Sequence, residues 1–292
     1  REIAQQRQQT ENDLRTAISA DQLQLAWQPI ISLETGILHG VEALVRWNHP
    51  TRGVLLPREF LEIAEESRLI LPISDWVLRE ACRQFVEWKR RASDLAPEYI
   101  SINLSERQLM QDDLVLLLTG VLREFNMQPN QLQVELTEAK IISHREAAGT
   151  VIHSLAKAGI RLAIDDFGTG YSSLACLQQY PIQVLKMDRS FLSNLSDGHD
   201  MLAVLNSIVT LAENLGIKCI AEGIEDLVQL AILKSMNCRF GQGNFLCPAV
   251  EADQIFEAPW KHAFQNASPR LTAEANQRGD LAEEKAMNPT LA

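Results

Sequence analysis

Two adjacent aspartates stand where an apolar, strand-like run ends, in the segment RLAIDDFGTGYSSL at 161–174. Carboxylates crowded together resist simultaneous ionisation unless a cation neutralises them. Neighbouring side chains of a strand point to opposite faces, so Asp165 and Asp166 can meet only where the backbone leaves strand geometry. The glycines of FGTG give the chain that freedom. We therefore expect both carboxylates to turn toward one point.

Other polar residues stand late in further strand-like runs. We expect strands at 23–31, 37–47, 99–105, 132–138, 160–166, 184–188, 218–223 and 239–246. Side chains alternate between the two faces of a strand, which assigns each polar residue to a face. Six of these residues arrive late in their runs: Glu42, Asn103, Glu135, Asp165, Lys186 and Glu222. If the strands are parallel, these groups converge at the carboxyl ends.

The converging groups are oxygen donors of the kind that hard divalent cations prefer. The candidate metal ligands are Glu42, Asn103, Glu135, Asp165, Asp166 and Glu222. We predict a pair of Mg²⁺ or Mn²⁺ ions, because two such ions roughly 3.5 to 4 Å apart can activate water and stabilise a leaving alkoxide. Lys186 and Arg46 would then attract the phosphate or the attacking water. This chemistry suggests phosphodiester hydrolysis.

The elements that must position these groups alternate between short apolar runs and amphipathic helical patterns from about 23 to 246. That rhythm predicts an α/β fold. Eight strands with intervening helices over roughly 250 residues match the size of a TIM-type barrel. Periodicity alone leaves a doubly wound sheet open.

Composition narrows the function further. The 292 residues are 46% hydrophobic, and no apolar run approaches the roughly 18 residues that a membrane helix needs. The net charge of −11 and the lack of a basic block disfavour binding to DNA or RNA polymers. Five cysteines without a CxxC pair indicate reduced, buried thiols and a cytoplasmic location. The scattered histidines offer no zinc-type pairing.

The chain divides into three parts. Residues 1–20 form a polar amphipathic pattern, which we interpret as a linker helix from a missing upstream region. Residues 21–261 carry the β/α rhythm and all candidate site residues. Residues 262–292 are polar and rich in turn formers, so we expect a disordered tail.

Several motifs closely resemble the ordered motifs of EAL-domain cyclic di-GMP phosphodiesterases, which hydrolyse cyclic di-GMP to linear pGpG. These motifs are GVEALVRWNHP, SINLSERQL, VELTE, AIDDFGTGYSSL, LKMDRSF, AEGIE and GQGNFLCP, and the resemblance runs from about 21 to 248. It implies a modified TIM (β/α)8 barrel with the first strand antiparallel to the others. The alternation of the runs does not predict that reversal.

The resemblance also implies residue roles. It assigns the six oxygen donors to the metal site, with Asp165 shared by both ions, and Lys186, Glu222 and Asp165 to catalysis, Lys186 positioning or activating the water. Positions associated with the substrate are Gln28, Leu44, Arg46, Asp188, Glu225 and Gln242. Glu138 matches the glutamate that steadies the DDFGTG loop.

Partners follow from the same resemblance and from ion chemistry. A homodimer and an upstream sensory or GGDEF-type domain are expected, and a full-length protein could be tethered to a membrane through missing domains. This segment itself should make no membrane contact. Ca²⁺ should inhibit, because its longer, looser coordination disfavours a compact two-metal geometry.

Four positions depart from the usual pattern of the family. Asn244 stands where Tyr is frequent, Asp226 where Thr often follows the AEGxE block, Arg239 where an acid is common, and Gln183 where Asp often occurs. None of the four is a metal ligand, so they bear on activity level, loop coupling or guanine contact.

Simpler interpretations compete with each assignment. An isolated acid at a strand end is more often solvated or a helix cap than a ligand. Arg46 could form a structural ion pair with Glu42, Lys186 could only neutralise the acids, and FGTG could be a simple turn. For the whole chain, the alternatives are a cyclic di-GMP receptor without catalysis and a structural interaction barrel. The complete ligand set argues against both.

Overall fold

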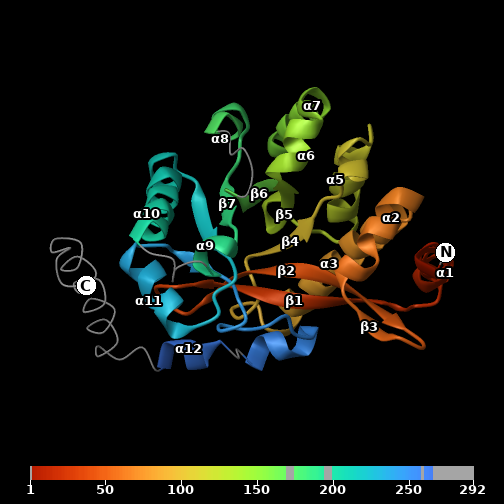
Figure 1. The fold of residues 1–292 in the computed structure, drawn as a ribbon, viewed down its shortest axis with the longest axis horizontal. Helices are drawn as coiled ribbons and strands as arrows, with labels where there is room; N and C mark the ends of the chain where they lie inside the picture. The colour runs from red at the N-terminus through yellow and green to blue at the C-terminus, as the bar shows by residue number, and fades with distance from the viewer. Residues whose placement is uncertain (1, 169–173, 194–198, 258–259, 266–292) are drawn as a thin grey trace.

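A closed barrel of eight strands forms the centre of the computed structural model, which describes residues 2–168, 174–193, 199–257 and 260–265 (Figure 1). The barrel strands are β1 (Leu23–Ser32), β2 (Leu38–His49), β4 (Tyr99–Asn103), β5 (Leu132–Thr137), β6 (Arg161–Phe167), β7 (Val184–Met187), β8 (Lys218–Ala221) and β9 (Phe240–Gly241). Pairing of β1 with both β2 and β9 closes the barrel. Closure rules out the doubly wound sheet.

The first strand runs against its neighbours. β1 is antiparallel to β2 and to β9, whereas the pairs from β2 through β4 to β9 are parallel. The fold is therefore a modified TIM barrel with an antiparallel first strand, as the family resemblance implied. A short strand, β3 (Gly53–Leu55), continues β2 as a hairpin and was not expected from the sequence.

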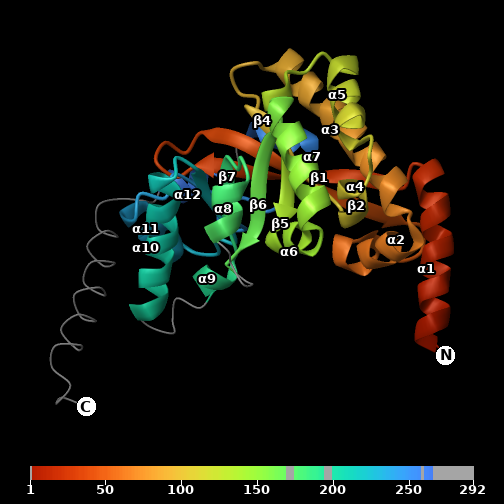
Figure 2. The same ribbon diagram turned by 90° about the horizontal axis from the view of Figure 1, so that it is seen from above.

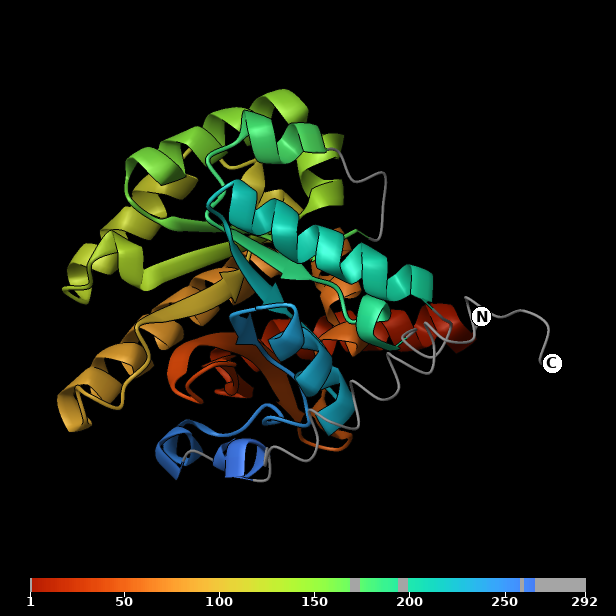
Figure 3. The same ribbon diagram turned by 90° about the vertical axis from the view of Figure 1, so that its left-hand side faces the viewer.

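Helices cover the outside of the barrel, as the side view in Figure 3 shows. The longer ones are α3 (Ile70–Arg91), α5 (Leu114–Glu124), α7 (Arg145–Lys157), α10 (His199–Asn214) and α11 (Leu227–Ser235). Shorter elements are α2 (Leu61–Ser67), α4 (Glu106–Leu109), α6 (Glu138–Ser143), α8 (Leu174–Gln179), α9 (Ser190–Ser193), α12 (Lys261–Gln265) and the 3₁₀ turns η1 (Pro57–Glu59), η2 (Pro129–Gln131) and η4 (Ala252–Glu257).

Alternation along the strands separates two apolar regions. Outward-facing residues such as Val41, Ile102 and Leu185 belong to the large core under the helices. Inward-facing residues form a smaller cluster inside the barrel, toward the amino ends of the parallel strands, made of Ile30, Tyr99, Ala163, Val184 and Ile220. The polar residues assigned to the same inner faces lie above this cluster, so the predicted register is confirmed.

The last strand is shorter than expected. Only Phe240 and Gly241 of the predicted 239–246 run are strand. The chain turns immediately afterwards, because the backbone nitrogens of Leu246 and Cys247 both bond the oxygen of Gly243.

The N-terminal residues form a helix, α1 (Glu2–Ser19), which lies beside α2 (Figure 2). Its buried Leu14 and Ala17 join a separate apolar cluster with Trp47 and Phe60. The link to an upstream region stays a prediction. Of the predicted tail, the short helix α12 is described, and residues 266–292 lie outside the described part.

All five cysteines are buried and free. Among the described helices, none combines the length and the apolar character that crossing a bilayer requires.

Candidate functional site

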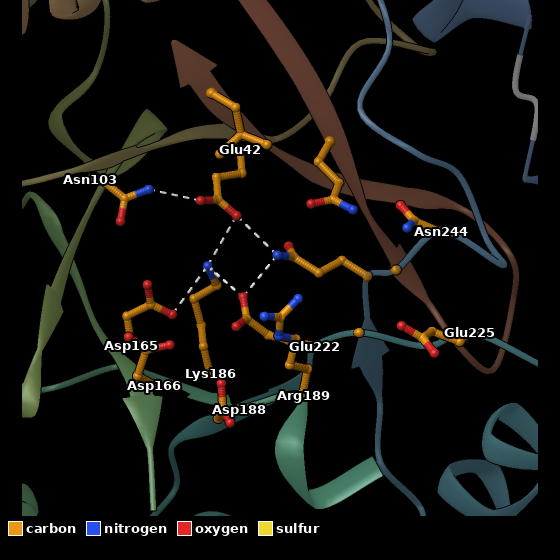
Figure 4. Close-up of a pocket in the computed structure, with 15 residues that line it drawn as sticks. Glu42, Asn103, Asp165, Asp166, Lys186, Asp188, Arg189, Glu222, Glu225 and Asn244 are labelled. Atoms are coloured by element: carbon orange, nitrogen blue, oxygen red, sulfur yellow. Dashed lines mark hydrogen bonds and ion pairs between the residues drawn. The ribbon is translucent and has the colours of Figure 1, made fainter. Parts of the chain in front are cut away.

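A cavity of about 490 Å³ opens at the carboxyl ends of the parallel strands, where the sequence predicted the site (Figure 4). Its lining residues are Gln28, Glu42, Leu44, Asn103, Asp165, Asp166, Lys186, Asp188, Arg189, Glu222, Gly223, Glu225, Gln242, Gly243 and Asn244. These come from seven of the barrel strands or from the turns that follow them. The convergence inferred from strand register is therefore present.

One ammonium group lies at the centre of four carboxylates. The Nζ atom of Lys186 is 2.6 Å from Glu135 Oε2, 2.7 Å from Glu222 Oε1, 3.1 Å from Glu42 Oε2 and 3.4 Å from Asp165 Oδ1. Lys186 is 1% exposed, so bulk water screens these interactions little. We call these five residues the acidic cluster.

The burial and mutual repulsion of the acids change their pKa values. Burial, together with the charges of Asp165 and Glu42, raises the pKa of Glu222 to about 8, although Lys186 opposes the shift. Burial and the charge of Glu42 likewise raise the pKa of Glu135. For Lys186 burial alone would lower the pKa, but the surrounding carboxylates outweigh it and raise that pKa well above its ordinary value. Lys186 therefore stays protonated.

Neutral side chains hold the carboxylates in place. Asn103 donates to Glu42 Oε1 over 2.8 Å. The amide nitrogen of Gln242 donates to both Glu42 Oε2 and Glu222 Oε1, at 2.9 and 2.8 Å. Hydrogen bonds of this kind fix the direction in which each oxygen points.

A second layer lies beneath the cavity. Glu135 is fully buried and does not line the cavity. It pairs with Ala163, whereas Asp165 pairs with Thr137, two residues further along both strands. Glu135 therefore lies deeper in the barrel than Asp165. Its Oε1 accepts a hydrogen bond from Ser101 at 2.5 Å, and the amide of Gln133 donates to Ser101 Oγ at 3.0 Å. Both oxygens of Glu135 are thus held by protein groups.

The two adjacent aspartates do reach a common point. Asp166 has φ of +53°, and the pairing of β6 with β7 is irregular between Ile164 and Phe167. We expected the FGTG glycines to provide this freedom, but Asp166 itself adopts the left-handed conformation, which aspartate tolerates better than most residues. Oxygens of Asp165, Asp166 and Glu222 consequently lie within 4.8 Å of one another.

These residues fit a divalent cation. The three carboxylates offer converging oxygens, and Asp165 Oδ1 is buried and makes no hydrogen bond within the described residues, although the Lys186 ammonium lies 3.4 Å away. A buried oxygen without a hydrogen bond is stabilised further when a bound cation or water satisfies it. Hard cations such as Mg²⁺ and Mn²⁺ prefer this set of donors. Five of the six predicted ligands line the cavity, and Glu135 lies beneath them.

The predicted substrate residues divide into two groups. Gln28, Leu44, Asp188, Glu225 and Gln242 line the cavity. Arg46 does not: its guanidinium is half-buried and donates to the neighbouring Val45 carbonyl at 3.0 Å. Within the described residues, Arg46 also lacks the ion pair with Glu42 that the simpler interpretation proposed.

Glu138 is buried at the start of α6. The loop residues 169–173, which it was expected to steady, lie outside the described part. Its supporting role stays a prediction.

The four departures from the family pattern have different structural settings. Asn244 lines the cavity. Asp226 caps α11 by accepting from the backbone nitrogen of Gln229 at 2.8 Å. Gln183 accepts from the backbone nitrogen of Leu162 at 2.7 Å, and Arg239 is exposed.

Arg189 lines the cavity but was not predicted from the sequence. Strand alternation gives no information about it, because it follows the end of β7. Its position directly after Asp188 was the available signal. The sequence also gave no indication of a role for Ser101 and Gln133, which hold Glu135 from below.

Comparison with known proteins agrees with the fold. The sequence model of the EAL domain family matches residues 11–249. The chain is 38% identical over 252 residues to the bifunctional diguanylate cyclase/cyclic di-GMP phosphodiesterase MucR of Pseudomonas aeruginosa, which covers 86% of this chain and 36% of MucR. It is 37% identical over 269 residues to the cyclic di-GMP phosphodiesterase NbdA of the same species, which covers 91% of this chain and 34% of NbdA.

Solved structures give the same result. The MucR phosphodiesterase in complex with cyclic di-GMP superposes with a TM-score of 0.80 at 37% identity, covering 85% of this chain and 99% of that one. The EAL enzyme Bd1971, bound to cAMP and cyclic di-GMP, gives 0.81 at 32% identity, covering 87% and 69%. The chain spans about a third of the length of the curated relatives it matches. From its motifs, its barrel and these matches, the chain belongs to the EAL domain family.

Proposed function

We propose that this chain is a metal-dependent phosphodiesterase that hydrolyses cyclic di-GMP to linear pGpG. The observation that carries the proposal is the acidic cluster at the barrel mouth, together with Asn103 and Asp166 on the same cavity. A structural barrel has no need for several buried carboxylates at one point, since burying like charges is costly. The relatives named as cyclic di-GMP phosphodiesterases support the choice of substrate.

Glu42, Asn103, Asp165, Asp166 and Glu222 would hold Mg²⁺ or Mn²⁺, with Glu135 supporting them from below. When bound, two such cations would lower the pKa of a water molecule and neutralise charge on the phosphoryl group. The protein contributes the placement of the donor oxygens, which Gln242, Asn103 and Lys186 fix by hydrogen bonds.

The reaction adds one water to one phosphodiester. The water oxygen bonds to phosphorus, the bond from phosphorus to the 3′ oxygen breaks, and the phosphate stays on the 5′ side. The water gives one proton to a carboxylate of the acidic cluster, and the 3′ oxygen takes up a proton as it leaves. The surrounding carboxylates raise the pKa of Lys186 and favour its protonated form. Its role is to orient the water and stabilise negative charge.

The cavity also offers groups for the rest of the nucleotide. Gln28, Leu44, Glu225 and Asn244 also line it, and the amides of Gln28 and Asn244 and the carboxylate of Glu225 can meet the polar edges of guanine. We also propose that the protein forms a homodimer, is cytoplasmic and carries an upstream sensory or GGDEF-type domain. MucR is named as a bifunctional enzyme with a diguanylate cyclase activity, and this chain matches 36% of it, which supports a further domain.

A product assay tests the proposal. Purified protein is incubated with cyclic di-GMP and Mn²⁺ or Mg²⁺ in water enriched in heavy oxygen, and the products are analysed by mass spectrometry. We expect pGpG with one heavy oxygen on its 5′ phosphate. Binding of cyclic di-GMP without product under either metal, by folded protein, would instead identify a receptor. Failure to bind either nucleotide or metal in calorimetry would leave the structural barrel.

A further inference from the structure

Arg189 is the one cationic side chain lining the cavity that has no partner within the described residues. The lining includes six carboxylates but only two cations, Lys186 and Arg189. Lys186 lies at the floor, 1% exposed, and is shared among four carboxylates. Arg189 is exposed, and within the described residues its guanidinium makes no ion pair or hydrogen bond. It is therefore available to a ligand.

Tight packing fixes where Arg189 lies. Gly223 follows Glu222 and has φ of +69°, and a Cβ built on it would lie 2.3 Å from Cβ of Arg189. On the other side, a Cβ on Gly168 would lie 2.3 Å from the ring of Phe191. The segment from Arg189 to Phe191 is thus held between the turn after Asp165 and Asp166 and the turn after Glu222.

Hydrogen bonds hold the same segment to the rim. Asp188 Oδ1 accepts from the backbone nitrogen of Ser190 at 2.9 Å. The buried side chain of Gln229 donates to the Leu192 carbonyl at 3.2 Å and accepts from the backbone nitrogen of Glu225 at 2.7 Å. Gln229 therefore connects the backbone beyond Arg189 to the loop that contains Glu225. The guanidinium of Arg189 projects into the cavity from this fixed backbone (Figure 4).

We infer that Arg189 binds the second phosphodiester of the cyclic dinucleotide, the one that is not cleaved. This inference rests on the proposed function. The two phosphodiesters lie on opposite sides of the ring, so when one is at the acidic cluster the other faces the rim. A negatively charged phosphodiester that enters a cavity lined by six carboxylates needs a cation as its partner. A guanidinium group pairs well with two phosphate oxygens. Arg189 is the lining cation that remains for it.

The test compares two substrates. Cyclic di-GMP carries two phosphodiesters, and bis(p-nitrophenyl) phosphate carries one. For Arg189→Ala we expect kcat/KM for cyclic di-GMP to fall roughly tenfold to a hundredfold, mainly through KM, as for the loss of a hydrogen bond to a charged group. For bis(p-nitrophenyl) phosphate we expect kcat/KM to be unchanged. Arg189→Lys should lose less, and Arg123→Ala, an exposed arginine in α5, should lose nothing.

The other outcomes separate this inference from the proposed function. Equal losses on both substrates would place Arg189 at the reacting phosphate and overturn the inference, as would no loss on either. If the wild type turns over neither substrate, its calorimetric affinity for cyclic di-GMP in Ca²⁺ is compared with that of Arg189→Ala. Weaker binding by the variant then supports the inference although the proposed function has failed. Equal binding, or no binding by the wild type, overturns the inference.

Discussion

The Nζ atom of Lys186 lies 2.6 Å from Oε2 of Glu135, and both side chains are almost completely buried inside the barrel. This contact joins the floor of the cavity to the layer of Ser101 and Gln133 below it. Because three further carboxylates share the same ammonium, the charge balance of the whole mouth depends on Lys186.

Replacing this lysine should affect stability as well as turnover. Lys186→Met leaves four carboxylates without their counter-charge, and removing one partner of a buried pair costs about 3–5 kcal/mol. We expect urea unfolding to show a loss of that order and the turnover of cyclic di-GMP to disappear. Lys157→Met, at an exposed position in α7, is the control. A Lys186→Met variant as stable as the control would contradict the charge balance described here.

The hydroxyl of Ser101 should matter although it does not line the cavity. It donates to Glu135 Oε1, so Ser101→Ala leaves that oxygen with the longer bond from Gln133, at 3.3 Å. Loss of a group that orients a metal-site carboxylate typically reduces activity or metal affinity by about 10–100-fold. We expect such a loss in a Mn²⁺ titration of turnover, and none for the exposed Ser207→Ala. Unchanged activity would show that Glu135 needs no such support.

Two glycines should respond in opposite directions to alanine. Gly223 has a positive φ and contacts Arg189, so Gly223→Ala should lower the free energy of unfolding by more than the roughly 1–2 kcal/mol of a left-handed residue alone. Gly120 lies inside α5 with open space around it, so Gly120→Ala should raise the free energy by about 0.5–1 kcal/mol. Urea denaturation measures both. Equal effects of the two substitutions would contradict the packing of Gly223 against Arg189.

His39, near the amino end of β2 and away from the cavity, predicts a pH dependence of stability. His39 lies 3.1 Å from Glu98 through Nδ1 and 3.1 Å from the Lys218 ammonium through Nε2, an arrangement that suits a neutral ring with Nε2 as the acceptor. Burial, then Lys218 and, more weakly, Arg161, lower the pKa of His39 below its ordinary value of 6.5, although Glu98 opposes them.

Whether stability rises or falls with pH depends on which state, folded or unfolded, binds the extra proton. Below about pH 6.5 the unfolded chain protonates His39 and the folded chain does not, so stability is present above this pH and is lost as pH falls toward the lowered pKa. Between about pH 7.5 and 5.5, His39→Gln should therefore lose less unfolding free energy than the wild type. Identical losses in urea denaturation would refute a neutral His39.

Strand alternation predicted the inner face of the barrel well, because side chains on one face repeat every second residue. Glu42, Asn103 and Lys186 lie where that rule places them. The rule says nothing of height along the barrel. Glu135 is level with Ala163 and lies beneath the cavity. Arg46 lies beyond the mouth, since β2 continues to His49 while the lining reaches only Leu44.

Other features could not be obtained from alternation at all. The direction of β1 came from the resemblance to the family, because a strand pattern reads the same in both directions. Arg189 belongs to a turn, where no period applies, and the packing of Gly223 that fixes it depends on two segments far apart in sequence. The positive φ of Asp166 was also not predicted, because the adjacent glycines are the residues that most readily adopt such a conformation.

The central claim is that the carboxylates at the barrel mouth hold divalent cations that hydrolyse the dinucleotide. The most direct measurement is the formation of pGpG by chelator-stripped protein as Mn²⁺ is added back, with folded Asp165→Asn measured in parallel. We predict no product without metal, saturable turnover of the wild type with Mn²⁺, and none for Asp165→Asn. Turnover that is independent of added metal, or equal in both proteins, would contradict the claim.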